Sequence, residues 1–487
     1  MEKKNYRHTY LSCISVNLMA FITGIGYSWS SPCIPKLRDV IDPENNPLGR
    51  AATLQEISWI TSLHALGSLA GPLLTGTMSK KIGKKKTLII FSLPQVASSI
   101  IMFFAFEVEH FYVARFLLGI GTGCVFSVIP SYVGEISEPA IRGRTSMLNS
   151  VLLTAGQTVV LTVGPFVTIR TISLMTLTTS IIFLFTFSFY VPESPYHYVL
   201  HGKVDKAKSN LKKWGRTDST EKELLDIIEI CDKSKNEQTI KAILSSRILQ
   251  RCLIICLGLV SLQSLVGNPA IVAYQQTILD NSSSTIPGET SVIVISILQM
   301  IGTYWSTGLV DRWGRKQLLY ISYLGLLVSL VILGGYLILI ELKVKLEAFF
   351  WIPFASILSY IVFYKIGAGP LPWTLSGEIF PPSFKPHLSA LTALVMTSVN
   401  FLVTLLFPYF LVNVGLGITM WIFAAFGILS LIFIRLAVPE TKGKSLIDIQ
   451  RMLLEGKVAL PNFEEENICS EEKELFEVSV NVNLDGR

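Results

Sequence analysis

The chain has 487 residues, of which half are hydrophobic and only 16% are charged, and its mean hydropathy is +0.52. A soluble enzyme of this length needs a more polar surface, so this composition argues against that class and indicates an integral membrane protein. The formal net charge of +6 does not indicate a nucleic-acid partner, because the basic residues are spread over short connections and do not gather on one soluble domain.

Long apolar runs follow one another along the chain. A bilayer core of roughly 30 Å needs about 20 apolar residues per helix. Runs of this kind start near residues 10, 56, 87, 110, 146, 171, 251, 290, 318, 348, 388 and 417. We therefore predict an all-α membrane protein with twelve transmembrane helices. The first run is too long for a signal peptide, so we expect it to be retained as a helix.

The connections between the runs predict five parts. These are a cytosolic N-terminus over 1–9, a six-helix bundle over 10–191, a cytosolic helical linker over 192–250, a second six-helix bundle over 251–438 and a cytosolic tail over 439–487. Basic residues resist translocation, and those in the short connections fall on one side of the membrane if both termini are cytosolic. This orientation puts the sequon at Asn281 outside, so we predict glycosylation there.

Three motifs occur twice in the same order. They are Gly134-Glu135-Ile136 with Gly377-Glu378-Ile379, the basic turn from Lys80 with the turn from Asp311, and Pro192-Glu193-Ser194 with Pro439-Glu440-Thr441. Their offsets of 243, 231 and 247 residues give nearly one spacing. This repeat predicts two pseudo-symmetric six-helix bundles that face each other, which is the architecture of a carrier.

Five segments carry a family resemblance: PSYVGEISEPAIRGR, VPESPYHYVL, LVDRWGRK, GAGPLPWTLSGEIFPPSFK and VPETKGKSL. They resemble the signature set of the sugar porter family in the major facilitator superfamily, over residues 10 to 450. Within that family, the stretch from Tyr27 to Leu37 is similar to the arthropod facilitated trehalose transporter branch. The resemblance implies the major facilitator fold, a small-molecule sugar as substrate, the lipid bilayer as surroundings and no cofactor. We expect a monomer in the plasma membrane.

Candidate sugar-binding side chains stand at helical spacing within the runs. Carboxamides suit a neutral polyol because each offers donors and an acceptor, although polar side chains also join helices within membranes. The resemblance adds a tryptophan whose indole stacks on the sugar ring, within a run that two prolines and two glycines must break. The predicted substrate-binding set is Gln263, Asn268, Gln299, Trp373, Asn400, Ser150, Gln157 and Tyr274.

The chain departs from the glucose-transporter pattern at four site positions. Family carboxamides are replaced at Ser150, Ser264, Pro269 and Met396. Asn268 and Asn149 stand one residue away from such positions, but neighbours on a helix point about 100° apart. These departures indicate a different or larger sugar, or weak binding.

Charges at the predicted cytosolic ends of the helices are candidates for a gate. The predicted gating residues are Glu135, Arg142, Asp311, Arg312, Arg315, Glu378 and Lys385. Each ion pair at a wet interface is worth about 1 kcal/mol or less, but several together bias an equilibrium between two states. The alternative is that these charges only set the topology. Lys80 stands where the family usually carries an acidic residue, so the first half would contribute less to closure.

Proton coupling requires a titratable group in the cavity. Proton-coupled members of the resembling family carry an aspartate where Ser28 stands, so Arg115 lacks its usual carboxylate partner. We therefore predict facilitated diffusion of a sugar, trehalose or a hexose, by alternating access. His64 and Lys365 keep proton-coupled symport open, and the departures at the sugar site also fit a non-transporting sugar sensor. No clustered acid, base, nucleophile or metal site appears, so we do not expect an enzyme.

Overall fold

The computed structural model describes residues 7–39, 46–138, 141–213, 221, 224–225, 227–228, 247–282, 287–312, 314–344, 347–380, 385–442 and 452. The backbones of Arg142, Asp311, Arg312 and Lys385 lie in helices, but their side chains fall outside the described part. Part of the predicted linker and most of the predicted tail also fall outside it.

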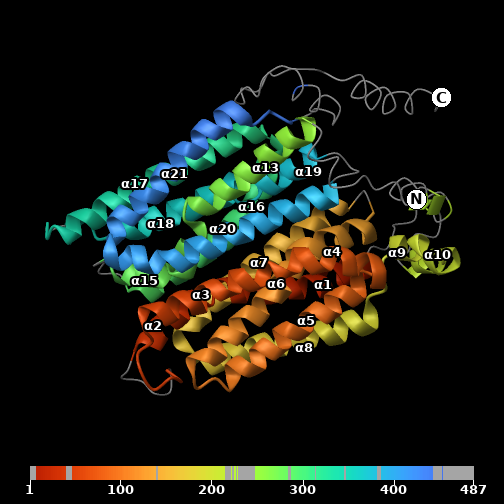
Figure 1. The fold of residues 1–487 in the computed structure, drawn as a ribbon, viewed down its shortest axis with the longest axis horizontal. Helices are drawn as coiled ribbons and strands as arrows, with labels where there is room; N and C mark the ends of the chain where they lie inside the picture. The colour runs from red at the N-terminus through yellow and green to blue at the C-terminus, as the bar shows by residue number, and fades with distance from the viewer. Residues whose placement is uncertain are drawn as a thin grey trace.

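The first half of the chain forms one bundle of long helices (Figure 1). In chain order these are α1 (Arg7–Ser28), α2 (Ser30–Arg38), α3 (Leu54–Ser68), α4 (Ala70–Ile82), α5 (Lys84–Phe103), α6 (Val108–Ile136), α7 (Arg142–Val163), the 3-10 turn η1 (Gly164–Phe166) and α8 (Ile169–Tyr190). The pairs α1–α2 and α3–α4 each form one interrupted span. The short helices α9 (Pro195–Leu200) and α10 (Val204–Lys213) follow, beside the end of α4.

The second half forms a matching bundle. Its elements are α13 (Arg247–Leu265), α14 (Asn268–Ala273), α15 (Gln275–Asp280), α16 (Gly288–Arg312), α17 (Arg315–Glu341), the 3-10 turn η2 (Glu347–Phe349), α18 (Ile352–Phe363), the π-helical turn η3 (Tyr364–Ala368), α19 (Leu371–Ile379), α20 (Lys385–Asn413) and α21 (Leu416–Ala437). Eleven segments of the described chain are long and apolar enough to span a membrane. The twelfth predicted span is α16, whose apolar part is Gly288–Thr303. The predicted all-α membrane fold is confirmed.

Close helix packing within the first bundle depends on small residues, as is usual between helices in membranes. A Cβ on Gly24 of α1 would lie 2.0 Å from the carbonyl oxygen of Leu153 on α7. A Cβ on Gly156 of α7 would lie 2.0 Å from the carbonyl oxygen of Phe21. Glycine at both positions therefore lets the two backbones touch.

The predicted break in the tenth span is present at η3, between α18 and α19. The prolines and glycines of this stretch interrupt the regular hydrogen-bond ladder. One side chain of α17 satisfies the freed backbone groups: the Ser322 hydroxyl donates to the Phe363 carbonyl at 2.6 Å and accepts from the Ala368 amide at 2.8 Å. The break is therefore held by the neighbouring helix, as a non-helical segment at membrane depth requires.

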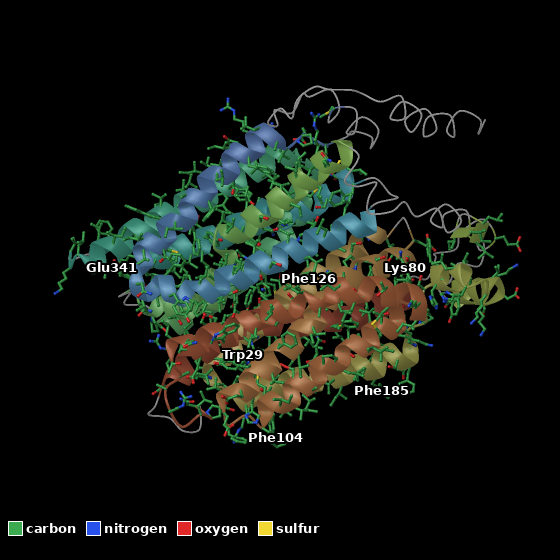
Figure 2. The ribbon with its side chains drawn as sticks, in the orientation of Figure 1. Trp29, Lys80, Phe104, Phe126, Phe185 and Glu341 are labelled. Carbon is green, nitrogen blue, oxygen red and sulfur yellow. The ribbon has the colours of Figure 1, made fainter. Side chains whose placement is uncertain are left out.

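The two bundles meet along α3 with α20 and along α7 with α16. Figure 2 labels Lys80 at one end of the molecule and Glu341 at the other, and we call these the Lys80 end and the Glu341 end. The Lys80 end is the one that the sequence assigns to the cytosol. Among the described residues, hydrogen bonds between the bundles lie between mid-span and the Glu341 end. These are Ser58 Oγ to the Leu405 carbonyl (2.5 Å), the Gln276 amide to Ser31 Oγ (3.2 Å), Thr158 Oγ1 to the Ser296 carbonyl (3.1 Å) and Gln299 Nε2 to Gln157 Oε1 (2.9 Å).

Asn281, the predicted glycosylation site, follows α15 at the Glu341 end and is exposed. Its side-chain amide donates to the Thr277 carbonyl at 2.8 Å. Ser283, the third residue of the sequon, lies outside the described part of the chain. Glycosylation at Asn281 remains a prediction.

Candidate functional site

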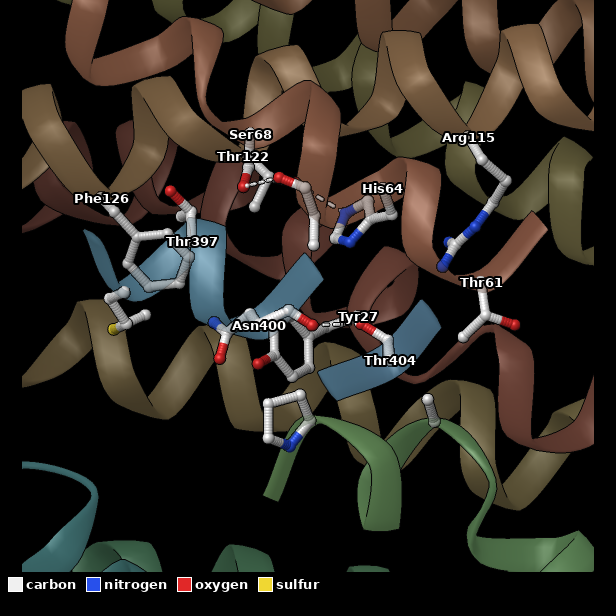
Figure 3. Close-up of a pocket in the computed structure, with 14 residues that line it drawn as sticks. Tyr27, Thr61, His64, Ser68, Arg115, Thr122, Phe126, Thr397, Asn400 and Thr404 are labelled. Atoms are coloured by element: carbon white, nitrogen blue, oxygen red, sulfur yellow. Dashed lines mark hydrogen bonds between the residues drawn. The ribbon is translucent and has the colours of Figure 1, made fainter. Parts of the chain in front are cut away.

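A cavity of about 490 Å³, counting the part open to solvent, lies between the two bundles (Figure 3). The first bundle lines it with Tyr27, Thr61, His64, Ala65, Ser68, Arg115, Thr122 and Phe126. The second bundle lines it with Pro269, Ala273, Met396, Thr397, Asn400 and Thr404. The cavity is therefore shared between the halves, as a carrier requires.

The wall from the first bundle is built around His64 of α3. Its Nε2 lies 3.1 Å from Thr122 Oγ1 on α6 in a hydrogen bond, and its ring meets the Tyr27 ring edge-on at 6.1 Å between centroids. The Thr122 hydroxyl donates to the Leu118 carbonyl at 3.2 Å, so the imidazole donates through Nε2 and keeps Nδ1 as an acceptor. Both side chains are buried.

The hydroxyls around the cavity share one hydrogen-bond pattern. Thr61, Ser68 and Thr397 each donate to a carbonyl of the preceding turn, at 2.8, 2.7 and 2.9 Å. A hydroxyl used in this way satisfies its hydrogen within its own helix and still has lone pairs to accept another hydrogen bond. These groups can therefore accept from a ligand that carries hydroxyl donors.

Three of the predicted substrate-binding residues lie in the cavity lining or directly beside it. Asn400 lines the cavity. Asn268 and Tyr274 are buried in and beside α14 and flank the lining residues Pro269 and Ala273. The Tyr274 ring packs on Phe407 with centroids 5.0 Å apart.

The predicted glutamines pair with other side chains. Gln299 donates to Gln157 across the two bundles, at 2.9 Å. Gln263 donates from Nε2 to the Tyr364 hydroxyl and to the Gly369 carbonyl, both at 3.0 Å. The remaining oxygen of Gln263 is buried and has no hydrogen-bond partner in the described part of the chain.

The other two predicted residues lie apart from these pairs. Trp373 is half-buried on α19, directly after the break. Ser150 is exposed on α7, although Gln157 on the same helix is buried. Helical spacing alone therefore did not separate the inward positions of α7 from the outward ones.

Arg115 of α6 is buried beside the interruption between α1 and α2. Its guanidinium donates to the Gly26 carbonyl at 2.7 Å, to the Ile60 carbonyl at 3.0 Å and to Ser30 Oγ at 3.2 Å. It also lies over the Trp29 ring, 5.1 Å from the centroid. The positive charge is thus held by uncharged acceptors that join α6 to α1, α2 and α3.

At the Lys80 end, the first bundle holds a charged cluster around Glu135. This carboxylate pairs with Lys84 and accepts from Ser194 Oγ at 2.5 Å. Beside it, the Glu193 carboxylate accepts from the backbone amides of Lys85 at 3.1 Å and Ser194 at 2.9 Å. Burial raises the pKa of Glu193, while the backbone donors act in the opposite direction.

The second bundle repeats this cluster around Glu378. This carboxylate pairs with Arg315 at 3.1 Å and accepts from Thr441 Oγ1 at 2.5 Å. The Glu440 carboxylate accepts from the backbone amides of Arg315 at 3.0 Å and Lys316 at 3.1 Å. The duplication predicted from the sequence therefore extends to individual contacts.

These ion pairs join residues of the same bundle, so each carboxylate is held within its own half. The predicted gating residues Glu135, Arg315 and Glu378 belong to the two clusters. The side chains of Arg142, Asp311, Arg312 and Lys385 lie outside the described part of the chain. Lys84, Ser194 and Thr441 were not predicted as partners of these carboxylates, although the duplicated Pro-Glu-Ser and Pro-Glu-Thr motifs contain Ser194 and Thr441.

Comparisons with known proteins agree with this architecture. The family model described as "Sugar (and other) transporter" matches residues 9–453. The chain is 29% identical over 467 residues to a facilitated trehalose transporter of Bombyx mori, covering 94% of this chain and 90% of that protein. It is 29% identical over 450 residues to one of Apis mellifera ligustica, covering 92% and 88%. For a relative in Aedes aegypti, also 29% identical over 92% of this chain, the match spans only 55% of that protein.

Solved structures show the same fold. A partially occluded inward open form of the xylose transporter XylE from E. coli matches with a TM-score of 0.75 at 22% identity, over 90% of this chain and 100% of that one. The proton:xylose symporter XylE bound to 6-bromo-6-deoxy-D-glucose matches with a TM-score of 0.71 at 21% identity, over 91% and 99%. The resemblance inferred from the motifs is confirmed, and the chain belongs to the sugar transporter family of the major facilitator superfamily.

Proposed function

We propose that this chain is a facilitative carrier of trehalose or a hexose in the plasma membrane, with both termini in the cytosol, and that it is not an enzyme. A cavity lined by both bundles supports alternating access, because either half can tilt while the polar lining stays between them. The hydrogen bonds between bundles from mid-span to the Glu341 end fit a form whose predicted outer side is closed.

The observation that carries the facilitative mode is the environment of Arg115. Its acceptors are two carbonyls and one hydroxyl, and the neighbouring Ser28 is buried and uncharged. Neither these acceptors nor the Ser28 hydroxyl changes charge near neutral pH. The surroundings of Arg115 therefore have no proton to exchange when a sugar binds. Flux then follows the sugar gradient alone.

We assign sugar contact to Gln263, Gln299, Trp373 and Asn400. The buried oxygen of Gln263 supports this role, because a buried acceptor without a partner costs about 1–3 kcal/mol unless a ligand or water satisfies it. The two charged clusters would stabilise or release the Lys80 end as the bundles move. In the state described here, each cluster would hold the helices of its own half together. In the alternate state, its carboxylate would contact the other half.

Uptake into proteoliposomes tests the mode of transport. We expect labelled sugar to accumulate only to the external concentration, with an initial rate unchanged by a proton ionophore. Liposomes without protein provide the blank, and preloaded unlabelled sugar should produce counterflow. A sensor would show no counterflow.

Proton-coupled symport is the second candidate, and His64 favours it because this imidazole lines the cavity. Under symport, the ionophore would abolish accumulation against a gradient, and His64→Phe would remove this proton dependence. If uptake is insensitive to the ionophore in the wild-type chain, symport is rejected.

A further inference from the structure

The turn between α4 and α5 contains five lysines within residues 80–86. Two of them hold the turn to the rest of the first bundle. Lys84 pairs with Glu135, and Lys85 Nζ donates to the Ser188 carbonyl near the end of α8, at 2.7 Å. The other three are exposed, and we call them the lysine patch: Lys80, Lys81 and Lys86.

The second bundle repeats the two contacts that hold this turn. At the equivalent turn, Arg315 pairs with Glu378 at 3.1 Å. Lys316 Nζ donates to the Arg435 carbonyl near the end of α21, at 3.0 Å. These two basic positions therefore belong to the duplicated architecture, since each half uses them in the same way.

Two lysines of the patch have no basic counterpart in the second bundle. The repeat offset of 231 residues places Asp311 opposite Lys80 and Gln317 opposite Lys86. The second bundle thus forms the same turn with one acidic and one neutral residue at these places. The contacts that the two halves share do not account for Lys80 and Lys86, so these lysines call for a separate explanation.

The short helices that follow the first bundle add positive charge beside the lysine patch. Figure 1 shows α9 and α10 next to the end of α4. Burial lowers the pKa of His197 on α9, and nearby positive charges, those of Lys86 and Lys203 among them, act in the same direction. The carboxylates of Glu135 and Glu193 already accept from Lys84 and from backbone amides. The surface around the patch is therefore rich in cations.

Aromatic side chains place the patch at the level of lipid headgroups. The hydrogen bond from Lys85 to Ser188 sets the start of α5 level with the end of α8. Phe185, Phe189 and Tyr190 are exposed at that end of α8, and the Phe185 ring lies 5.1 Å from the Phe189 ring and 6.3 Å from the Tyr190 ring between centroids. Aromatic residues gather at membrane–water interfaces. Lysines beside them can therefore reach headgroup phosphates.

We propose that the lysine patch binds the anionic headgroups of phospholipids in the leaflet at the Lys80 end (Figure 2). Basic residues next to a membrane span are attracted to anionic lipid surfaces, and each lysine ammonium group offers three donors to phosphate oxygens. The orientation predicted from the sequence puts this leaflet on the cytosolic side, where anionic lipids are enriched. The alternative is that these lysines only set the topology. The inference does not rest on sugar transport.

Native mass spectrometry of the purified full-length chain in a neutral detergent tests the proposal. The probes are phosphatidylinositol 4,5-bisphosphate, phosphatidylserine and phosphatidylcholine. We expect the two anionic lipids to bind at lower concentrations than phosphatidylcholine, and their binding to weaken as salt rises. Each lysine near an anionic lipid surface contributes about fivefold to binding. A variant that combines Lys80→Asp with Lys86→Gln should therefore bind the anionic lipids about tenfold to a hundredfold more weakly.

That variant copies the residues of the second bundle, so the backbone of the turn accommodates them. The control variant combines Arg38→Gln, Arg170→Gln and Lys343→Gln, three exposed cations at the Glu341 end. Both variants lower the net charge by the same amount. The control should bind anionic lipids within about twofold of the wild-type chain. Melting temperatures check that both variants are folded, and Lys86→Gln alone, with an expected loss of about fivefold, replaces the double variant if that one unfolds.

Three results would overturn the proposal. Phosphatidylcholine could bind as tightly as the anionic lipids, which would remove the role of headgroup charge. The two variants could lose affinity equally, which would assign binding to net charge and not to the lysine patch. Inorganic phosphate could displace the lipid at an equal concentration, which would indicate a site for a soluble anion. Selective loss in the variant of the lysine patch, without displacement by phosphate, supports the proposal.

Discussion

The two bundles hold their charged clusters in the same way, but they contribute differently to the cavity. At the Lys80 end, Glu135 and Glu378 each accept from one basic side chain and one hydroxyl. Around the cavity, the first bundle supplies an imidazole and the second supplies a carboxamide and a methionine. The contacts within the two charged clusters are thus duplicated, whereas the residues that line the cavity differ between the bundles.

The strongest test of this likeness is to remove the two carboxylates separately. Glu135→Ala and Glu378→Ala each delete an ion pair and a hydroxyl contact whose side chains are mostly shielded from solvent. We expect each variant to lower the free energy of unfolding by about 2–3 kcal/mol and to slow sugar uptake by about tenfold or more. Thermal unfolding and initial uptake rates measure this. A loss in one variant only would contradict the likeness of the two clusters.

Gly83 and Gly314 precede α5 and α17, whose first turns are basic. Substitutions at these two glycines should reveal a smaller difference in stability between the bundles. A Cβ on Gly83 would lie 2.3 Å from Glu193 Oε2, and one on Gly314 would lie 2.5 Å from Glu440 Oε2. Gly83 has a φ of 94° and a ψ of 159°, a conformation that is essentially restricted to glycine, whereas Gly314 has a φ of −63°.

Gly83→Ala should therefore destabilise the protein by about 1–3 kcal/mol more than Gly314→Ala. The melting temperatures of the two variants in one detergent measure the difference. Equal melting temperatures would mean that the backbone at Gly83 relaxes and that the clash with the carboxylate dominates in both bundles.

The smallest effect is expected where the bundles touch through Gln157 and Gln299. The two amides share one hydrogen bond at 2.9 Å, so Gln157→Ala and Gln299→Ala each remove about 0.5–1.5 kcal/mol of inter-bundle contact. If Gln299 also contacts the sugar, its variant alone should raise the sugar KM. A double-mutant cycle on sugar affinity separates the two roles. Equal sugar KM values for Gln157→Ala and Gln299→Ala would mean that this pair only holds the two bundles together.

Much of the fold follows from local sequence signals. Membrane helices satisfy their own backbone groups, so long apolar runs predict them, and the tenth-span break follows from the prolines and glycines near Trp373. The duplicated motifs predicted the likeness of Glu135 and Glu378, but not the partners that each carboxylate has within its own bundle. These features depend on residues that are close together in the chain or on repeated motifs. Both are visible in a single sequence.

The cavity was less predictable because it depends on contacts between distant segments. The hydrogen bond between Gln157 and Gln299 joins residues 142 positions apart, and no periodicity indicates their partnership. Ser68, Thr122 and Thr397 were not predicted as site residues, because hydroxyl side chains commonly form hydrogen bonds between membrane helices. His64 was predicted only as a titratable group, because its place in the cavity depends on the packing of α3, α6 and α20.

One short helix carries a residue from each of the two regions. Trp373 and Glu378 both lie on α19, a helix of nine residues that follows the break held by Ser322 of α17. A displacement of α19 would move the indole of Trp373 and the carboxylate of Glu378 together. We therefore infer that loss of the Glu378 contacts with Arg315 and Thr441 also shifts the tryptophan assigned to sugar contact.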